Sequence, residues 1–357
     1  MSATLTTRSM QPQAVLVLPH LRVQNANAIS SPLTHGFPSI TAFTGLMWAL
    51  ERKLAQAGIA LQLLKVGVIC HAHEEQVVDG YVKTFCLTRN PVGKDGTTAA
   101  IVEEGRIHLN ITLVFGVATS GAPLLLEQAS QDPDHALARH VADVLATMRV
   151  AGGTLLPAPD GPRRSIRPWV ALLPEASGAR ESEFRQWRRQ WLPGYALVGR
   201  DDLLAARLAH LQQTRPSATL LDAWLHASRF NHAPEPLVDG AAPIPDGKVV
   251  WTDPLRAKGA GWTVPIPVGY AALTAGPPHA AGAVANARDA NTPLAFVESV
   301  YSLGEWISPH RLHSVDDLFW HTDETDAAKG LYRCRSGYVA PGSEADALDD
   351  DDDPDFD

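Results

Sequence analysis

The segment from Val23 to Ser39 holds the densest group of side chains that could bind a ligand. These are hydrogen-bonding side chains, a glycine and one aromatic ring: Gln24, Asn25, Asn27, Ser30, Ser31, Thr34, His35, Gly36 and Phe37. Asn and Gln can pair with an adenine edge, a phenyl ring can stack on a base, and amides at a helix start bind phosphate. The same residue types also form turns and caps that satisfy only the loop's own backbone. Composition leaves both interpretations open.

A second candidate is the histidine pair His71 and His73, which are two residues apart and share one face of a predicted strand, with Glu74 adjacent. Such a pair could ligate a metal or act as an acid and a base. No third ligand is evident, and histidines at a strand end are usually surface or hydrogen-bonded groups. The sequence also lacks the G-x-S-x-G, H-E-x-x-H, Walker and G-x-G-x-x-G motifs. We therefore predict no catalytic residue, no metal site and no cofactor.

Two arginine-containing loops flank the glycine-containing segment 91–100. One carries Arg89 and Asn90, and the other leads into Arg106. The segment could close over a strand of nucleic acid, or it could be a long hairpin between two strands. Further along, His310 and His313 are three residues apart and could in principle ligate a metal, but the charge of the intervening Arg311 opposes metal binding. Contact with RNA or protein is expected there.

The elements that position these residues follow from hydrophobic periodicity. An apolar run, Ala14–Val23, predicts a strand in which Pro19 indicates an edge position or a bulge. Pro38 is predicted as the first residue of a helix that ends at Gly58. The apolar face of that helix consists of Ile40, Phe43, Met47, Leu50 and Leu54.

Two more strands and a second helix follow. Ile59–His73 alternates, then shifts by one residue at Leu63 and Leu64, as a bulge requires. Arg106–Val117 alternates strictly, which predicts one apolar face and one polar, available face. The polar face holds Arg106, His108, Asn110 and Thr112. A helix is predicted from Pro133 to Met148, ending at Gly152-Gly153, and a strand within Ile166–Leu173.

The order β-α-β-β-α-β is that of ferredoxin-like and RNA-recognition folds, in which helices cover one face of a sheet and the other face is open to a ligand. We therefore predict an α+β protein in five parts. These are a ferredoxin-like core (14–175), a helical insertion (176–232), a linker (233–247), a C-terminal part that packs on the core (248–340) and a disordered acidic tail (341–357).

Composition narrows the class of protein. The chain has 357 residues, of which 45% are hydrophobic, and three widely spaced cysteines, so a core without disulfides is expected. The first residues do not form a secretory signal and no run is long enough to span a membrane, which predicts a cytoplasmic protein. The formal charge of −9 arises from nine acidic residues after Pro341. The remaining body is neutral, which is compatible with a basic groove for a polyanion.

Several sequence segments, taken in their order along the chain, resemble those of a known family. The run Val23–Thr34 with Gly36-Phe37-Pro38 resembles the Csy-type subunit that grips the 5′ handle of guide RNA in type I-F CRISPR surveillance complexes. Further matching strings are Leu18-Pro19, Leu87–Pro91, Ala99–Arg106, Val264–Pro267, Asn286–Asp289, Leu303–Trp306 and Ser308–Arg311. The similarity extends from about Ala14 to Arg333, and the acidic tail departs from the family pattern.

The resemblance implies a RAMP-type ferredoxin-like subunit of the Cas five family, without nuclease activity. Its implied partners are the 5′ handle of the crRNA, a large subunit and the backbone subunits that coat the guide, with target DNA nearby. It marks Gln24–Phe37 and the loops of Arg89 and Arg106 as RNA-binding surfaces, to which we add Arg288, His310 and Arg311 from the matching strings. Gly152-Gly153 resembles the glycine-rich loop of RAMP proteins.

Two other functions remain open. One is a RAMP-type endoribonuclease that uses His71 or His73 for acid–base catalysis. The other is a purely structural bridge between protein subunits.

Overall fold

The computed structural model describes residues 11–341, apart from 90, 99, 120, 121, 123, 158–166, 235–248, 250, 254, 255, 257–260, 275 and 323–328. Asn90, most of the predicted linker and the acidic tail from residue 342 onward lie outside the described residues.

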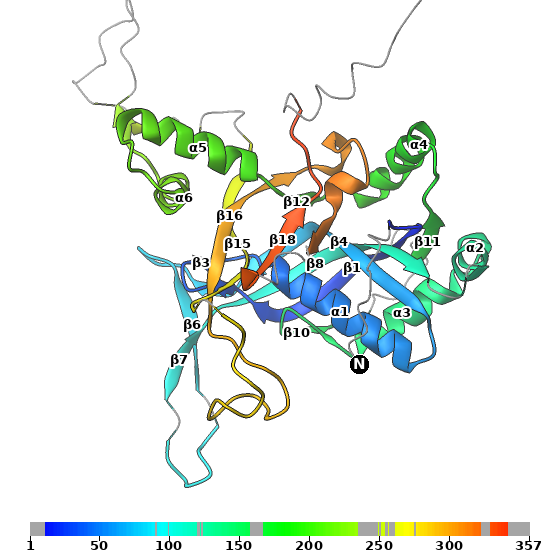
Figure 1. Cartoon of the computed structure of the whole chain (residues 1–357), viewed down its shortest axis with the longest axis horizontal. Helices are drawn as coiled ribbons and strands as arrows, with labels where there is room; N and C mark the ends of the chain where they lie inside the picture. Colours follow the sequence, from blue (N-terminus) through cyan, green and yellow to red (C-terminus); the bar gives the residue numbers. More distant parts are fainter. Residues whose placement is uncertain are drawn as a thin grey trace, which may run out of the picture.

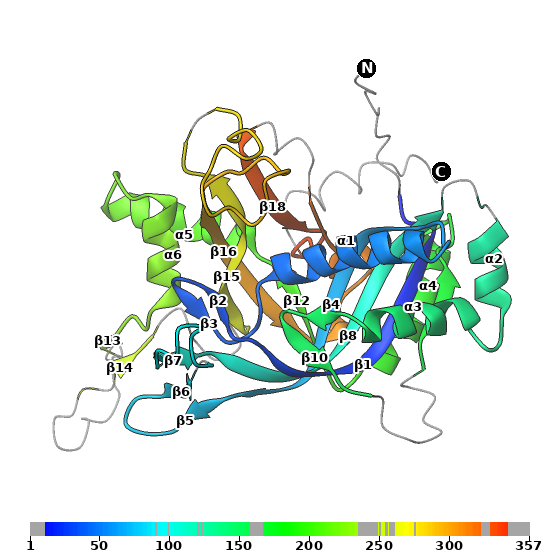
Figure 2. The ribbon, with the colours of Figure 1, turned by 90° about the horizontal axis from the view of Figure 1, so that it is seen from below.

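The N-terminal half is a mixed α/β unit with an antiparallel sheet. Its four main strands are β1 (Ala14–Asn27), β4 (Leu61–Glu75), β8 (Arg106–Thr119) and β11 (Trp169–Leu172), in the order β11-β1-β8-β4. Helix α1 (Ile40–Gln56) joins β1 to β4, and α2 (Leu124–Gln131) and α3 (Ala136–Ala146) join β8 to β11. Figure 2 shows α1 and α3 on the same face of this sheet. The predicted element order is present, and α2 is an additional helix.

Helix α1 supplies one wall of the main core. Its five predicted apolar residues are all buried, and each such side chain contributes about 1.5–3 kcal/mol by leaving water. The helix begins after Ser39, whose hydroxyl accepts a hydrogen bond of 3.3 Å from the amide of Thr41. Pro38 was predicted to be the first helical residue, and this is wrong, because Pro38 precedes the capping residue Ser39. Gly58, with φ of 80°, lies just beyond the end of the helix.

The predicted irregularities of the strands correspond to register shifts. In β4 the pairing with β8 shifts between Leu63 and Lys65, which confirms the predicted bulge. In β1 the register shifts between Leu18 and Leu21, so the bulge expected at Pro19 is also present. On the other side β1 pairs with β11 up to Val17 and with β10 (Gly153–Leu155) from Val23, so β1 is not an edge strand as a whole. Pro19 lies in the gap between these two partners, which agrees with the edge position expected there.

The second face of the sheet is covered over much of its area, which corrects the prediction of an open face. The covering layer consists of α4 (Ser177–Trp187) and three 3-10 helices, η2 (Arg188–Trp191), η5 (Pro309–Arg311) and η6 (Asp316–Leu318). It packs on the buried side chains of Val15, Val17, Ile69 and Val114. These apolar side chains are buried only because the layer covers them. The polar residues of β8, on which the prediction of an open face rested, lie on the other half of this face. That other half, around Arg22 and Gln24, is exposed.

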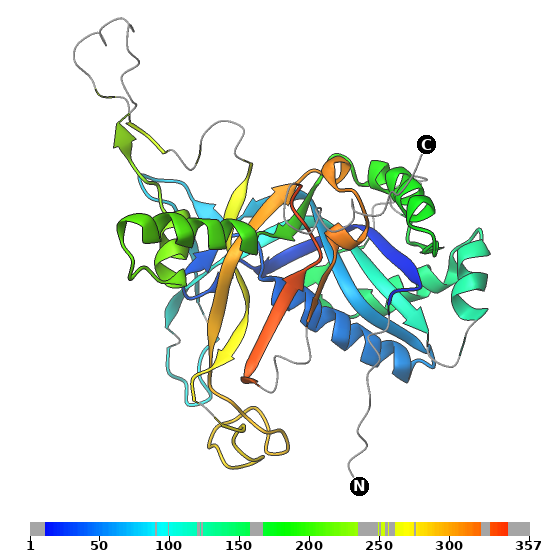
Figure 3. The same ribbon diagram turned by 45° about the horizontal axis from the view of Figure 1, so that its top comes forward.

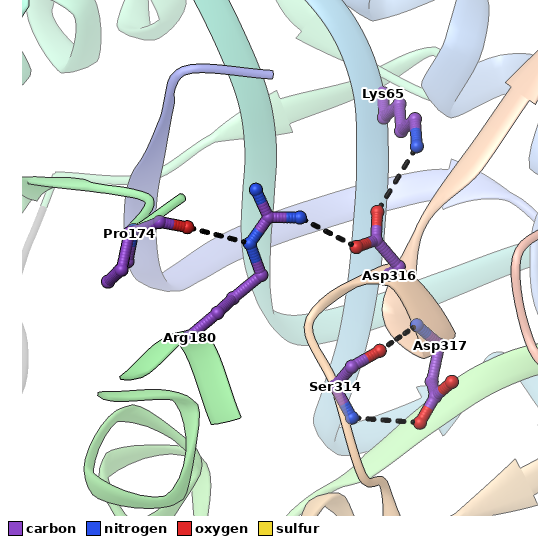
Figure 4. A network of polar contacts seen from close by, with 6 residues as sticks. All are labelled: Lys65, Pro174, Arg180, Ser314, Asp316 and Asp317. Carbon is purple, nitrogen blue, oxygen red and sulfur yellow. Dashed lines mark hydrogen bonds and ion pairs between the residues drawn. The ribbon is translucent and has the colours of Figure 1, made fainter. Parts of the chain in front are cut away.

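Polar contacts fix the covering layer to β4 (Figure 4). Asp316 of η6 accepts a 3.2 Å hydrogen bond from Nζ of Lys65, which lies in the β4 bulge, and forms a 3.5 Å ion pair with Arg180 of α4. Gly67 of β4 allows the close approach, since a Cβ at this position would overlap the side chain of Leu318. The bulge with Lys65 and the missing side chain at Gly67 thus allow β4 to pack closely against η6.

The C-terminal half extends the same sheet. Strands β12 (Tyr195–Gly199), β16 (Val297–Ile307), β15 (Thr263–Ala272), β18 (Leu331–Ser336) and β17 (Trp320–Thr322) pair in that order, and β12 and β17 both also pair with β4. Figure 3 shows β16, β15 and β18 side by side. These strands and β4 form a closed ring of pairings, so the part after residue 248 is continuous with the core sheet.

The predicted helical insertion, 176–232, contains helices and one strand. It holds α4, η2, α5 (Asp201–Thr214) and α6 (Leu220–Ser228), but also β12, which the helical prediction missed. Figure 1 shows α5 and α6 beside β16, and Nε1 of Trp224 in α6 donates to the carbonyl oxygen of Ser302 at 3.0 Å.

Short strands complete the described part of the chain. They are β2 (Ile29–Ser31), β3 (Thr34–His35), β5 (Val77–Val78), β6 (Thr84–Arg89), β7 (Ile101–Glu104), β9 (Arg149–Val150), β13 (Ala233–Pro234) and β14 (Trp251–Thr252). Strands β6 and β7 pair in register around 91–100, so the long-hairpin interpretation of that segment is confirmed. No helix in the described ranges has both the length and the apolar character needed to cross a membrane.

Candidate nucleic-acid interface

The end of β1 is shaped by two bulges. Its pairing with β8 shifts between Leu18 and Leu21 and again between Val23 and Ala26. Within these shifts His20 and Asn25 have φ of 52° and 56°, a region that Asn and His tolerate better than β-branched residues. The predicted polar turn therefore begins as a strand, because β1 continues through Asn27. Bulges redirect side chains, which is how this strand presents polar groups.

Both bulges are attached to the polar face of β8. The amide of His20 donates to Oγ1 of Thr112 at 3.2 Å, and the amide of Asn25 donates to Nδ1 of His108 at 3.1 Å. Because Nδ1 of His108 accepts this bond, the proton of the neutral ring lies on Nε2. In His108, Nδ1 thus accepts a hydrogen bond from the backbone, while the Nε2–H group can donate to a ligand.

The β9–β10 hairpin supports the second bulge from the other side. Its turn residues Ala151 and Gly152 both have positive φ, as two-residue hairpin turns require. The amide of Asn27 donates to the carbonyl of Ala151 at 2.8 Å. A Cβ on Gly153 would lie 2.8 Å from both the amide nitrogen of Ala26 and the carbonyl oxygen of Gln24. The predicted glycine-rich loop therefore holds the bulge in place.

These elements assemble one polar area, which we call the bulge surface. It consists of His20, Arg22, Gln24, Asn25, His108, Asn110 and Arg149. Arg149 belongs to it because Thr154 of β10 pairs with Gln24 on one side and with Arg149 on the other. The two arginines are exposed, and the surface itself contains no carboxylate, although Glu74 lies opposite His108 in the ladder. Arginine suits phosphate, and Asn and Gln suit base edges, so the chemistry fits a nucleic acid.

The next residues of the predicted site form a small hairpin with internal hydrogen bonds. Oγ of Ser31 and Oγ1 of Thr34 lie 2.6 Å apart, and Oγ of Ser30 lies 2.8 Å from the same Thr34 oxygen. Nδ2 of Asn27 donates to the carbonyl of Ile29 at 2.7 Å. These side chains therefore satisfy the backbone and hydroxyl groups of their own loop, as the alternative to ligand binding predicted.

The last three residues of the predicted segment also have partners. Nδ1 of His35 lies 2.8 Å from Oε1 of Glu75, and the amide of Gly36 donates to Ala28 rather than standing at the helix start. The ring of Phe37 stacks on Phe43 and meets Trp306 edge-on, with centroids 5.7 Å and 4.8 Å apart. Phe37 therefore packs against the hydrophobic core and is only partly exposed.

The remaining predicted residues divide between several elements. Arg106 lies opposite Asn27 in the ladder, at the border of the bulge surface, and pairs with Glu104 at 2.9 Å. Arg89 ends β6. Arg288 is exposed between β15 and β16, whereas His310 and Arg311 are exposed in η5 of the covering layer. Sequence reasoning missed Arg22 and Arg149. Arg22 is signalled only by the bulge at Pro19, which inverts the alternation after it.

His71 is a histidine with two structural partners. Its Nδ1 lies 2.7 Å from the carbonyl oxygen of Pro193 and must carry the proton, so its Nε2 accepts from the Thr112 hydroxyl at 2.8 Å. Its ring stacks on His20 with a centroid distance of 4.1 Å. Burial lowers the pKa of His71. The contacts fix the ring at the border between the covered and exposed halves of the sheet face.

The chain is thus a mixed α/β protein with one large antiparallel sheet, one face of which is polar and partly exposed. The family model described as CRISPR-associated protein (Cas_Csy2) matches residues 16–334, and the chain belongs to this family. It is 44% identical over 326 residues to the CRISPR-associated protein Csy2 of Pseudomonas aeruginosa (strain UCBPP-PA14), an alignment that covers 90% of this chain and 95% of that relative. The resemblance inferred from the sequence is thereby confirmed at the level of the family.

Proposed function

We propose that this chain is a non-catalytic subunit of a type I-F CRISPR RNA-guided complex, in which it holds the 5′ handle of the crRNA on the bulge surface. Membership of the Csy2 family supports the complex, and the β11-β1-β8-β4 order supports a ferredoxin-like RAMP fold. The other partners in this proposal are the large subunit and the guide-coating backbone subunits, and the complex acts in interference with target DNA.

The observation that carries the RNA part of the proposal is the bulged end of β1. Two bulges, two cross-strand hydrogen bonds and Gly153 hold Gln24 and Asn25 on an exposed, partly basic surface. Such a preformed site lowers the entropy cost of binding. Arg22 and Arg149 supply charge for phosphates, whereas the amide side chains and Nε2 of His108 supply donors for bases or the 2′-hydroxyl.

The ribonuclease alternative would use His71 or His73. Acid–base catalysis by a histidine requires a ring nitrogen that is available for the proton transfer. Both nitrogens of His71 have protein partners, and its pKa is lowered by burial, so holding RNA is favoured over cutting it. His73 is exposed and remains the residue on which the alternative would depend.

The purely structural alternative is a bridge that touches only proteins. Co-expression of the chain with its neighbouring genes and a CRISPR array, followed by ultraviolet crosslinking and RNA sequencing, separates the two functions. We expect crosslinks between the bulge surface and the repeat-derived 5′ end of the crRNA. A complex in which this chain crosslinks only to proteins would support the bridge instead.

A further inference from the structure

A large cleft adjoins the bulge surface, since it is lined by His71, which stacks on His20, and by Glu74, which lies opposite His108. Its volume is about 1130 Å³, and its walls come from the β2–β3 hairpin, the end of β4, β12 and the first half of β15. We call it the aromatic cleft because Phe37, Tyr195, Trp262 and Trp306 line it.

The aromatic residues form a connected row. Phe37 meets Trp306 edge-on at 4.8 Å, Trp306 lies 6.3 Å from Trp262, and Trp262 lies 5.8 Å from Tyr195. The row runs from the core outward, since Trp262 and Tyr195 are 50% and 48% exposed. Large exposed aromatic surface in a concave site is typical of binding sites.

The charges of the cleft are unlike those of the bulge surface. Among the described residues that line it, the carboxylates are Glu74, Glu75 and Asp79, and Lys83 is the single ammonium group. Lys83 lies 3.5 Å from Asp79 and Nδ1 of His35 lies 2.8 Å from Oε1 of Glu75, so these two carboxylates are partly neutralised, whereas Glu74 is exposed. A concave site with more carboxylates than cations concentrates a negative potential.

We propose that the aromatic cleft binds an arginine- or lysine-bearing segment of another protein subunit. A guanidinium or ammonium group is attracted both by the faces of Trp262 and Tyr195 and by the carboxylates of Glu75 and Asp79. Carboxylates repel phosphates, so the same charges disfavour an RNA strand. The inference rests on the proposed function only in that the chain is part of a multi-subunit complex.

The first experiment places the photo-crosslinker p-benzoylphenylalanine at position 262 of the full chain within the co-expressed, purified complex. We expect ultraviolet light to link this position to a partner-protein peptide that contains Arg or Lys. The matched control is the same replacement of Trp251, which is 58% exposed but does not line the cleft and should not give this product. Crosslinks to RNA, to a peptide without basic residues, or to nothing would each overturn the proposal.

The second experiment tests the charges. The double variant Glu75→Gln, Asp79→Asn should weaken the association of this chain with the partner identified by crosslinking by at least about fivefold, most strongly at low salt. Glu298→Gln, an exposed change on β16 outside the cleft, is the control and should have no effect. An unchanged affinity of the double variant for the partner would contradict the proposal.

The two proposals can fail separately. If the bulge surface does not hold RNA, the isolated chain will not bind repeat RNA, while the crosslink from position 262 to a basic peptide persists. If the cleft inference is wrong, repeat RNA still binds to the chain and the crosslink from position 262 is missing or joins RNA.

Discussion

The backbone amide of Asn25 in β1 donates a 3.1 Å hydrogen bond to Nδ1 of His108 in β8. This bond joins a bulge, which exposes side chains, to the polar half of a sheet face that is otherwise covered. It also fixes the tautomer of His108, so that the ring directs a donor away from the bulge. The candidate RNA site thus depends on backbone geometry as much as on side-chain identity.

Arg22→Ala and Arg149→Ala should each weaken binding of repeat RNA and reduce its salt dependence. One lost phosphate contact lowers the slope of log K against log salt by about 0.7 for single strands. Titrations at several salt concentrations measure this slope. Arg139→Ala, an exposed change on α3, is the control and should leave it unchanged. Equal slopes for all variants would exclude these arginines from the site.

Gly153→Ala should destabilise the fold by about 1–3 kcal/mol and weaken RNA binding, because the added methyl group meets the backbone of the second bulge. Urea unfolding and RNA titration measure the two effects. Gly178→Ala in α4 is the matched control, since a Cβ at Gly178 has no heavy atom within 4 Å. Wild-type stability for Gly153→Ala would show that the hairpin does not support the bulge.

A buried ion pair should account for much of the attachment of α5. Glu305 is 5% exposed and pairs with Arg200, which precedes α5 and also pairs with Asp202. Glu305→Gln leaves the guanidinium with Asp202 as its carboxylate partner and should cost about 1.5–3 kcal/mol of unfolding free energy, the range for a lost hydrogen bond to a charged group. Urea unfolding beside the exposed control Glu298→Gln tests this, and similar losses in both variants would contradict it.

Sequence periodicity predicted the elements whose partners are local or whose pattern is strong. The α1 stripe from Ile40 to Leu54, the alternation of β8 and the bulges at Pro19 and Leu63 are all present. The covering layer was not predicted because its contacts join segments that are distant in sequence. Val15 and Val17 on β1 belong to an unbroken apolar run, and such a run does not show whether one or both faces of its strand are buried.

The candidate site was predicted by composition and resemblance, and its boundaries were changed by backbone geometry. Asn and Ser are equally suited to ligands and to turns, so the sequence could not separate Asn25, which is exposed, from Ser31, which is buried in its hairpin. Arg149 and the aromatic row of Tyr195, Trp262 and Trp306 come together only through tertiary pairing.

Acid should destabilise the protein through His71. Burial lowers the pKa of folded His71 below the ordinary value of 6.5, so the unfolded chain takes up the proton first. The contribution of this ring is therefore fully present above pH 6.5 and is lost as the pH falls toward the folded pKa, by at most about 1.4 kcal/mol per pH unit. Unfolding free energies at pH 7.5 and 5.5 should differ less in His71→Gln than in the wild type. An equal difference would contradict the assignment.

The central claim is that the bulge surface binds repeat-derived RNA without cutting it. The most direct measurement is a titration of end-labelled repeat RNA with the purified chain, in which retardation and cleavage are read from the same samples. We predict saturable binding, intact RNA, and an affinity reduced by about tenfold or more in the double variant Gln24→Ala, Asn25→Gly, at about 1–3 kcal/mol for each lost base contact. Site-specific cleavage that disappears in His71→Ala or His73→Ala, or unchanged affinity of the double variant, would contradict the claim.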